Sequence, residues 1–293
     1  MKAEILKYIA YFDVFNHPLR LDELELLLHA DKAKINEWVE QLQQEKRIHS
    51  KDNYCSLQSN LKEMIAQRLH KESQAAHYFK RLPFYAKLIR SFPFVSAIGI
   101  SGSLSKNVMH DDGDIDYFII TKPGRLWICR TFLVGFKKLF LFNSKKYFCV
   151  NYFIDEENLM IPDHNMFTAI ETKFLLPVYN NALINAFKRA NSWSDELVLP
   201  FEHPIKVNEI HGKSWLGRFT EWMLKGKLGD RFDLRLMKFT YKRWEKKFKD
   251  FDATKFELTM RSNRGVSKHH PRDFQNKVLT AYRERLVKLK INE

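Results

Sequence analysis

Two acidic residues, Asp114 and Asp116, stand on either side of Ile115 at the start of an apolar run. In a strand, alternate side chains point to the same face, so we expect the two carboxylates to lie side by side. Paired carboxylates are ligands that a hard divalent cation such as Mg²⁺ prefers. The spacing therefore predicts a Mg²⁺ site at the beginning of this strand.

A glycine and a serine, Gly102 and Ser103, directly follow an earlier apolar run. Glycine lets the backbone approach a ligand closely, and a serine at a helix start offers its hydroxyl and free backbone N–H groups to a phosphate. We expect Gly102 and Ser103 to bind phosphate, with Ser105 and Lys106 as further candidates. Metal ligands beside a phosphate site indicate chemistry on a nucleoside triphosphate.

The elements around these residues must bring them together. Apolar runs predict strands at 94–100, 115–121 and 147–154, and a largely buried amphipathic helix at 125–142. Strands that alternate with helices favour a small mixed sheet backed by helices, in an α+β fold.

The pattern Gly102-Ser103, ten residues, then Asp114-Ile115-Asp116 resembles the signature of the nucleotidyltransferase superfamily related to DNA polymerase β. The resemblance covers about residues 90–160. It implies that the Gly-Ser pair begins a helix and holds a nucleoside triphosphate, and that the aspartates bind Mg²⁺. It also implies transfer of a nucleoside monophosphate to a hydroxyl, with loss of pyrophosphate. The alternative is an acidic turn without a ligand.

The third strand departs from this family's usual pattern. Active members carry a third carboxylate there, whereas the comparable position here holds Asn151. An asparagine carbonyl can ligate a metal, but it cannot accept a proton at neutral pH, so Asn151 is a candidate metal ligand only. Asp155, at the end of the strand, or Glu171, expected on the next helix, could supply the missing acid, and we favour Glu171. We expect Asp155 to be an exposed surface residue.

The chain before the core has two parts. Residues 1–58 are predicted to form three helices and a hairpin, which resembles a winged helix-turn-helix. Such a unit can bind DNA through its third helix or can contact another protein. Residues 59–91 are predicted to be linking helices, with a new helix beginning at Pro83. The nucleotidyltransferase core is then expected at 92–163.

Residues 164–293 are expected to form a basic, mainly helical C-terminal domain. We predict helices over 165–191 that are separated at Pro177. The aromatic residues of 214–250 are expected in the core, and 255–260 is expected to be a short strand. The basic stretch 261–272, including His269 and His270, is expected to be a loop that could contact phosphates or an acceptor.

Composition and charge restrict the partners. The 293 residues carry a net charge of +14, and residues 205–293 hold 23 Lys and Arg against 11 Asp and Glu, a difference of 12. Such an excess favours a nucleotide, a nucleic acid or an acidic protein surface. Three cysteines without metal-binding spacing suggest reduced thiols in the cytoplasm. No segment is typical of a signal peptide or a membrane span, so we expect no membrane partner.

Two functions from different classes fit these patterns. The first is a Mg²⁺-dependent nucleotidyltransferase acting on a hydroxyl of a protein, a nucleic acid or a small molecule. The second is a non-catalytic regulator that binds nucleotide or nucleic acid through a degenerate transferase core and the winged unit. A carboxylate within about 5 Å of the Asp114–Asp116 pair would favour the enzyme, because a base must reach its proton directly or through one water.

Overall fold

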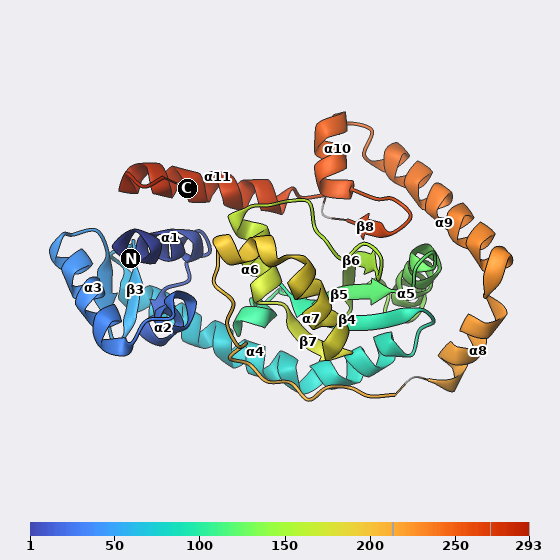
Figure 1. Ribbon diagram of the computed structural model, residues 1–293, viewed down its shortest axis with the longest axis horizontal. Coiled ribbons are helices and arrows are strands. Elements are labelled where there is room, and N and C mark those ends of the chain that lie inside the picture. Colours follow the sequence, from blue (N-terminus) through green and yellow to red (C-terminus); the bar gives the residue numbers. More distant parts are fainter. Residues whose placement is uncertain (213, 270, 293) are drawn as a thin grey trace.

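The computed structural model describes residues 1–212, 214–269 and 271–292. Figure 1 shows a small N-terminal group of helices beside a larger mixed sheet that helices cover. The elements of the N-terminal group are α1 (Lys2–Asp13), β1 (Leu19–Arg20), α2 (Leu21–Leu28), α3 (Lys32–Gln44), β2 (His49–Lys51) and β3 (Tyr54–Ser56). The helix α3 begins after Asp31, whose carboxylate caps it by accepting the backbone N–H of Lys34 at 2.9 Å. The predicted helices and hairpin are present, and β1 pairs with β3 as a third strand.

One helix, α4 (Leu61–Arg90), links the N-terminal group to the sheet and continues without a break through Pro83. The prediction that Pro83 begins a new helix is therefore wrong. Leu82, Ala86 and Ile89 lie on one face of α4 and are fully buried in the main core. Burial of this face outweighs the backbone hydrogen bond that the proline removes.

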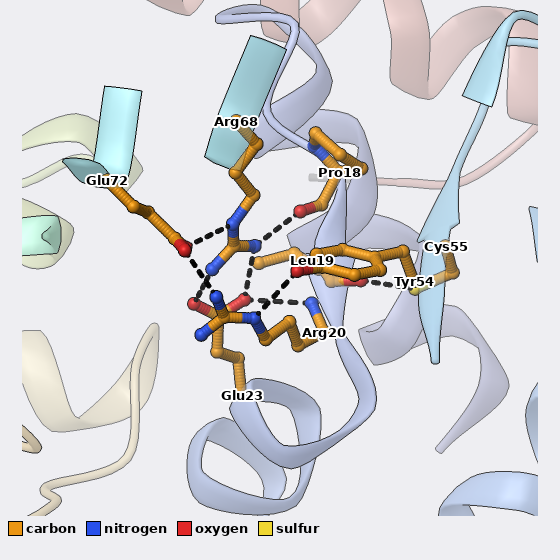
Figure 2. A network of polar contacts seen from close by, with 8 residues as sticks. All are labelled: Pro18, Leu19, Arg20, Glu23, Tyr54, Cys55, Arg68 and Glu72. Carbon is orange, nitrogen blue, oxygen red and sulfur yellow. Dashed lines mark hydrogen bonds and ion pairs between the residues drawn. The ribbon is translucent and has the colours of Figure 1, made fainter. Parts of the chain in front are cut away.

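A buried arginine of α4, Arg68, forms hydrogen bonds and ion pairs with the N-terminal group (Figure 2). Its guanidinium donates to both carboxylate oxygens of Glu23 at 2.5 and 2.8 Å and to Glu72 at 2.9 Å. It also donates to the carbonyl oxygen of Pro18 at 2.5 Å, and Arg20 reaches Glu72 at 2.5 Å. Two arginines and two glutamates thus balance one another around the buried guanidinium of Arg68, while Arg20 and Glu23 stay partly exposed, at 32% and 28%.

The central sheet has the strand order β7 (Leu176–Tyr179), β4 (Val95–Ser101), β5 (Asp116–Thr121), β6 (Cys149–Asp155), β8 (Val266–Lys268). β5 and β6 run parallel, and the other neighbours run antiparallel. The expected combination of helices with a mixed sheet is confirmed. Two of its strands, β7 and β8, come from residues 164–293, which we expect to form a helical C-terminal domain. The expected domain boundary at residue 163 therefore separates strands that belong to one sheet.

Helices cover both faces of the sheet. Those that follow the first strands are α5 (Leu126–Phe140), α6 (Met166–Lys173), α7 (Asn181–Ala190), α8 (Trp215–Met223), α9 (Gly226–Lys247), α10 (Ala253–Met260) and α11 (Phe274–Leu289). On one face, Ile98, Ile100 and Ile119 share a core with α4 and α5. On the other, Ala97 and Phe118 share a core with α7. This alternation buries the central strands on both sides.

Three local predictions in the second half of the chain need correction. Two helices, α6 and α7, are separated around Pro177 as expected, but Pro177 itself lies inside β7, an edge strand where a missing N–H is tolerated. Residues 255–260 belong to the helix α10, because the carboxylate of Asp252 caps it by accepting the N–H of Lys255 at 2.8 Å. Part of the predicted loop 261–272 forms β8 against β6.

The last helix, α11, returns to the N-terminal group and lies along α1 (Figure 1). Tyr282 packs edge-on against Tyr11, with ring centroids 5.8 Å apart. Arg285 donates to the carboxylate of Asp13 at 2.9 Å. The two ends of the chain therefore share one hydrophobic core.

The aromatic residues of α8 do not lie in the core as we expected. The exposed ones are Trp215, Phe219 and Trp222, at 72%, 50% and 65%. The face of α8 that carries Gly217 packs closely against the end of α4, since a Cβ on Gly217 would lie only 2.7 Å from the carbonyl oxygen of Ser91. Helical periodicity identifies a face but not which face is buried. None of the helices in the described ranges is long and apolar enough to span a membrane.

Candidate functional site

Two carboxylates and a thiol meet where β5 and β6 begin. Asp114 and Asp116 flank Ile115, which is fully buried, so their side chains point to the same side of the chain. The parallel register of β5 and β6 pairs Asp116 with Cys149. Ligand atoms of Asp114, Asp116 and Cys149 all lie within 4.8 Å of one another. The expected carboxylate pair is present, and Cys149 joins it.

The turn after β4 brings the backbone against this group. Gly102 has a φ of +68°, and a Cβ there would lie 2.7 Å from Oδ2 of Asp116. Both the left-handed backbone and the close approach require glycine at this position. The resemblance implies a full helix after the Gly-Ser pair, but the chain forms only the short 3₁₀ turn η1 (Leu104–Lys106).

Glu171, from α6, occupies the same corner of the site. Its Oε2 accepts the backbone N–H of Gly102 at 2.9 Å, and its Oε1 accepts Nζ of Lys106 at 2.8 Å. Glu171 is not part of the group that lies within 4.8 Å among the described residues. The candidate third acid is therefore close to the pair, but an ion pair with Lys106 holds it.

A cavity of about 380 Å³ adjoins this group. Its acidic lining residues are Asp114, Asp116, Asp163 and Glu171, its basic ones are Lys145, Lys268, His269 and Arg272, and its aromatic ones include Tyr152, Phe167 and Phe274. This volume and mixture suit a ligand that has anionic groups and a flat ring. Part of the predicted basic loop 261–272 thus borders the cavity, while His270 lies outside the described residues.

Only one of the four residues that we expect to bind phosphate lines this cavity. Gly102 lines the cavity, whereas Ser103, Ser105 and Lys106 do not. Ser105 is fully buried, and its hydroxyl donates to the carbonyl oxygen of Gly102 at 2.8 Å. Lys106 contacts Glu171 and lines a different cavity. In this arrangement the hydroxyl of Ser105 is already used and cannot reach a phosphate.

Asn151 lines the cavity, but its amide group is turned toward a neighbour on its own strand. Nδ2 of Asn151 donates to Sγ of Cys149 at 2.8 Å. Cys149 therefore joins the two aspartates, and a metal bond from the amide oxygen of Asn151 stays a prediction. Alternation along β6 places both residues on one face and is the signal that could have found Cys149. Local cysteine spacing could not, because the contact arises from the pairing of β5 with β6.

Asp155, at the end of β6, is not the exposed residue that we expected. Asp155 is only 3% exposed. Its Oδ1 accepts a hydrogen bond from Nδ2 of Asn158 at 2.7 Å. It also accepts the backbone N–H of Glu157 at 3.1 Å. Asp155 therefore organises the turn after β6, away from the acidic pair.

Burial and repulsion change the protonation of the group. Burial first, and then the negative charge of Asp114, raise the pKa of Asp116 to about 7. A hydrogen bond with Cys149 and the ammonium of Lys106 act in the opposite direction. Burial also raises the pKa of the Cys149 thiol far above its usual range. A bound cation would reverse both effects, because metal ligands lose their protons on binding.

This raised pKa predicts a pH-dependent stability. The folded protein holds a proton on Asp116 that the unfolded chain releases near pH 4, so the metal-free protein loses stability as pH rises from about 4 to about 7. We expect Asp116→Asn to raise the free energy of unfolding at pH 8 by about 2–4 kcal/mol. At pH 4 it should change little. Urea unfolding with EDTA at both pH values measures this, with the exposed Asp112→Asn as the control. An equal effect of Asp116→Asn at the two pH values would contradict the raised pKa of Asp116.

The donor atoms fit a divalent cation. Two carboxylates suit Mg²⁺, and a thiolate adds a softer ligand that Zn²⁺ and Co²⁺ prefer. We expect the purified protein to bind Co²⁺ with a thiolate-to-metal absorption band. Cys149→Ser should abolish the band and weaken Zn²⁺ binding by about 10-fold or more, with little effect on Mg²⁺. Cys55→Ser, at a buried cysteine of β3, is the control. A band that survives in Cys149→Ser would exclude this thiol as a ligand.

Comparison of the chain with models of protein families, with curated proteins and with solved structures finds no match.

Proposed function

We propose that the chain is a Mg²⁺-dependent nucleotidyltransferase, which moves a nucleoside monophosphate from a nucleoside triphosphate to a hydroxyl acceptor. One observation carries the proposal. Asp114 and Asp116 lie together against the backbone of Gly102, beside a cavity of about 380 Å³. The Gly-Ser turn follows β4 and the acidic pair opens β5, which agrees with the arrangement that the resemblance implies. The relationship to the nucleotidyltransferase superfamily is itself part of the proposal.

Each residue of the site has a role in this proposal. Asp114 and Asp116 hold the cation, whose charge neutralises the triphosphate and orients its α-phosphorus. Gly102 lets the triphosphate approach the backbone. Lys145 and Arg272, both exposed at the cavity, supply positive charge for the phosphates.

The acceptor must lose a proton as it attacks. Its oxygen forms the new bond to the α-phosphorus, the bond to the bridging oxygen breaks, and pyrophosphate leaves. Glu171 is the carboxylate that would take the acceptor's proton, after it has left Lys106. The acceptor belongs to a nucleic acid, a protein or a small molecule, and the N-terminal group, which resembles a winged helix-turn-helix, is the candidate for recruiting it.

Two contacts favour a second candidate function. Glu171 is held by Lys106, and Asn151 cannot accept a proton where active relatives of this superfamily carry an acid. A site in that state would bind a nucleotide and leave it intact. The chain would then be a regulator that binds nucleotide or nucleic acid and carries a winged-helix module.

One experiment tests both functions. The full chain is incubated with each α-labelled nucleoside triphosphate, Mg²⁺ and a cell extract. Label in protein, nucleic acid and small molecules is then measured together with pyrophosphate and with nucleotide binding. Transfer of label with equimolar pyrophosphate supports the enzyme. Binding without transfer supports the regulator, and a chain that neither binds nor transfers excludes both.

A further inference from the structure

A second cavity, of about 230 Å³, lies between the N-terminal group and the turn that follows Gly102. It shares no lining residue with the cavity beside Asp114 and Asp116. Its charged lining residues are Arg20, Arg68 and Lys106 together with Asp22 and Glu23, and its uncharged polar ones are His17, Ser105 and Asn107. The proposed function does not use this cavity, and its lining is too polar to be only a packing defect.

His17 is the unusual residue of this second cavity. It is 8% exposed, and its ring packs beside that of Phe12 with centroids 5.5 Å apart. Within the described residues, neither ring nitrogen is hydrogen-bonded to another group, and neither is wholly enclosed by protein, so the cavity reaches the ring. Buried polar side chains are almost always hydrogen-bonded. An unpartnered imidazole in the wall of a cavity therefore points to a ligand atom that would bond to it.

The charges near His17 indicate the sign of that ligand. Burial first, and then nearby cations, hold the pKa of His17 well below its usual range; the cations are Arg68, Lys71, Arg20 and Lys106. The ring is thus neutral and can donate one N–H. Glu72 binds both guanidinium groups and Glu23 binds that of Arg68, so both groups are held in place (Figure 2). The lining carries three cations against the two carboxylates of Asp22 and Glu23, an excess of one positive charge, so an N–H donor beside these cations suits an oxyanion.

Apart from these charged and polar residues, the lining is apolar and consists of Phe12, Leu19, Leu26, Leu27, Phe174, Pro204 and Ile205. The volume lies below the range of pockets for drug-sized ligands. We propose that this cavity is a second ligand site, which takes a small molecule with a carboxylate or phosphate group and an apolar body. We further propose that its occupant controls Glu171 of the main site through Lys106.

Lys106 is the link between the two cavities. It lines the second cavity, where its Nζ lies 5.5 Å from the ring centroid of Phe174. The same Nζ donates to Oε1 of Glu171 at 2.8 Å, and Glu171 lines the first cavity. An oxyanion beside His17 competes with Glu171 for this ammonium. Its binding would release the Glu171 carboxylate toward Asp114 and Asp116. This half of the inference rests on the proposed metal site, whereas the ligand site itself does not.

Calorimetric titration of the metal-free full chain tests the ligand site. Benzoate and phenyl phosphate are the probes, and benzyl alcohol is their neutral counterpart. At least one of the two anions should bind saturably, about 10-fold or more tightly than the alcohol, and the tighter anion identifies the head group. His17→Phe should weaken binding by about 10-fold or more. His70→Phe is the matched control, because His70 is an exposed histidine of α4.

The outcomes of this titration are distinct. Wild type that binds neither anion, or binds the alcohol equally well, overturns the ligand site, and so does full affinity in His17→Phe. Should His17→Phe fail to fold, wild type labelled with ¹⁵N at histidine decides the matter. Addition of the bound anion must then shift the ring resonances of His17 while those of His70 stay unchanged.

A second titration tests the link to the main site. With the anion bound, the affinity for Co²⁺ should rise about threefold or more, and Co²⁺ should raise the affinity for the anion by the same factor. Lys106→Met should raise the Co²⁺ affinity on its own and remove the effect of the anion. If Co²⁺ and the anion both bind but neither affects the other, the link is wrong. If no metal binds, the proposed metal site fails while the anion titration still tests the second cavity.

Discussion

Asp114→Asn and Asp116→Asn are each expected to lower the rate of nucleotidyl transfer by about 1,000-fold or more. The reason is that each change removes a ligand charge from the cation that would stabilise the triphosphate in the transition state. Each carboxylate contributes a ligand atom to the group within 4.8 Å. The measurement is transfer of label from an α-labelled nucleoside triphosphate under single-turnover conditions with Mg²⁺.

The control for this prediction is Asp112→Asn. Asp112 is an exposed acid of the same turn and lies outside the metal group, so its amide variant should keep full activity. Unfolding of every variant shows whether the fold is intact, and Asp116→Asn should be the more stable protein at pH 8. If the variants of Asp114 and Asp116 transfer label as fast as wild type, the active site lies elsewhere.

The sequence predicts the centre of this molecule well because its signals there are local. The runs that become β4 and β5 are apolar, and they carry Gly102 and the two aspartates at their ends. The contact of Gly102 with Asp116 follows from the antiparallel pairing of two strands that are neighbours in sequence. Strands that follow one another in the chain usually pair, so the main features of the site could be expected before the structure.

The features that were missed depend on distant parts of the chain. Cys149 reaches Asp116 only through the parallel pairing of β5 and β6, which no local spacing shows. Pro177 is acceptable in a strand only because β7 lies at the edge of the sheet. Lys106 was assigned to phosphate, but the contact with Glu171 requires α6 to pack beside the Gly-Ser turn. In each case tertiary packing decided between two local possibilities.

Arg68→Met is expected to lower the free energy of unfolding by about 3–5 kcal/mol, because the change leaves two carboxylates without their buried counterion. The side chain of Arg68 is 1% exposed and is bound by Glu23 and Glu72 at 2.5 and 2.9 Å. Methionine fills much of the same volume, so the loss reports the charges and hydrogen bonds rather than a cavity. Urea unfolding at neutral pH gives the difference, and Arg81→Met, an exposed position of the same helix, is the control and should change stability little.

A variant that also removes both carboxylates separates two explanations of that loss. When Glu23→Gln and Glu72→Gln accompany Arg68→Met, the one charge left in the network is that of Arg20, whose side chain is 32% exposed, and most of the stability should return. A triple variant as unstable as Arg68→Met alone would mean that the guanidinium acts mainly through its bond to the carbonyl oxygen of Pro18 and through packing. Because Arg68 also lines the second cavity, the triple variant should bind benzoate or phenyl phosphate more weakly even where it is stable. Stability and ligand binding would then be separate consequences of one buried arginine.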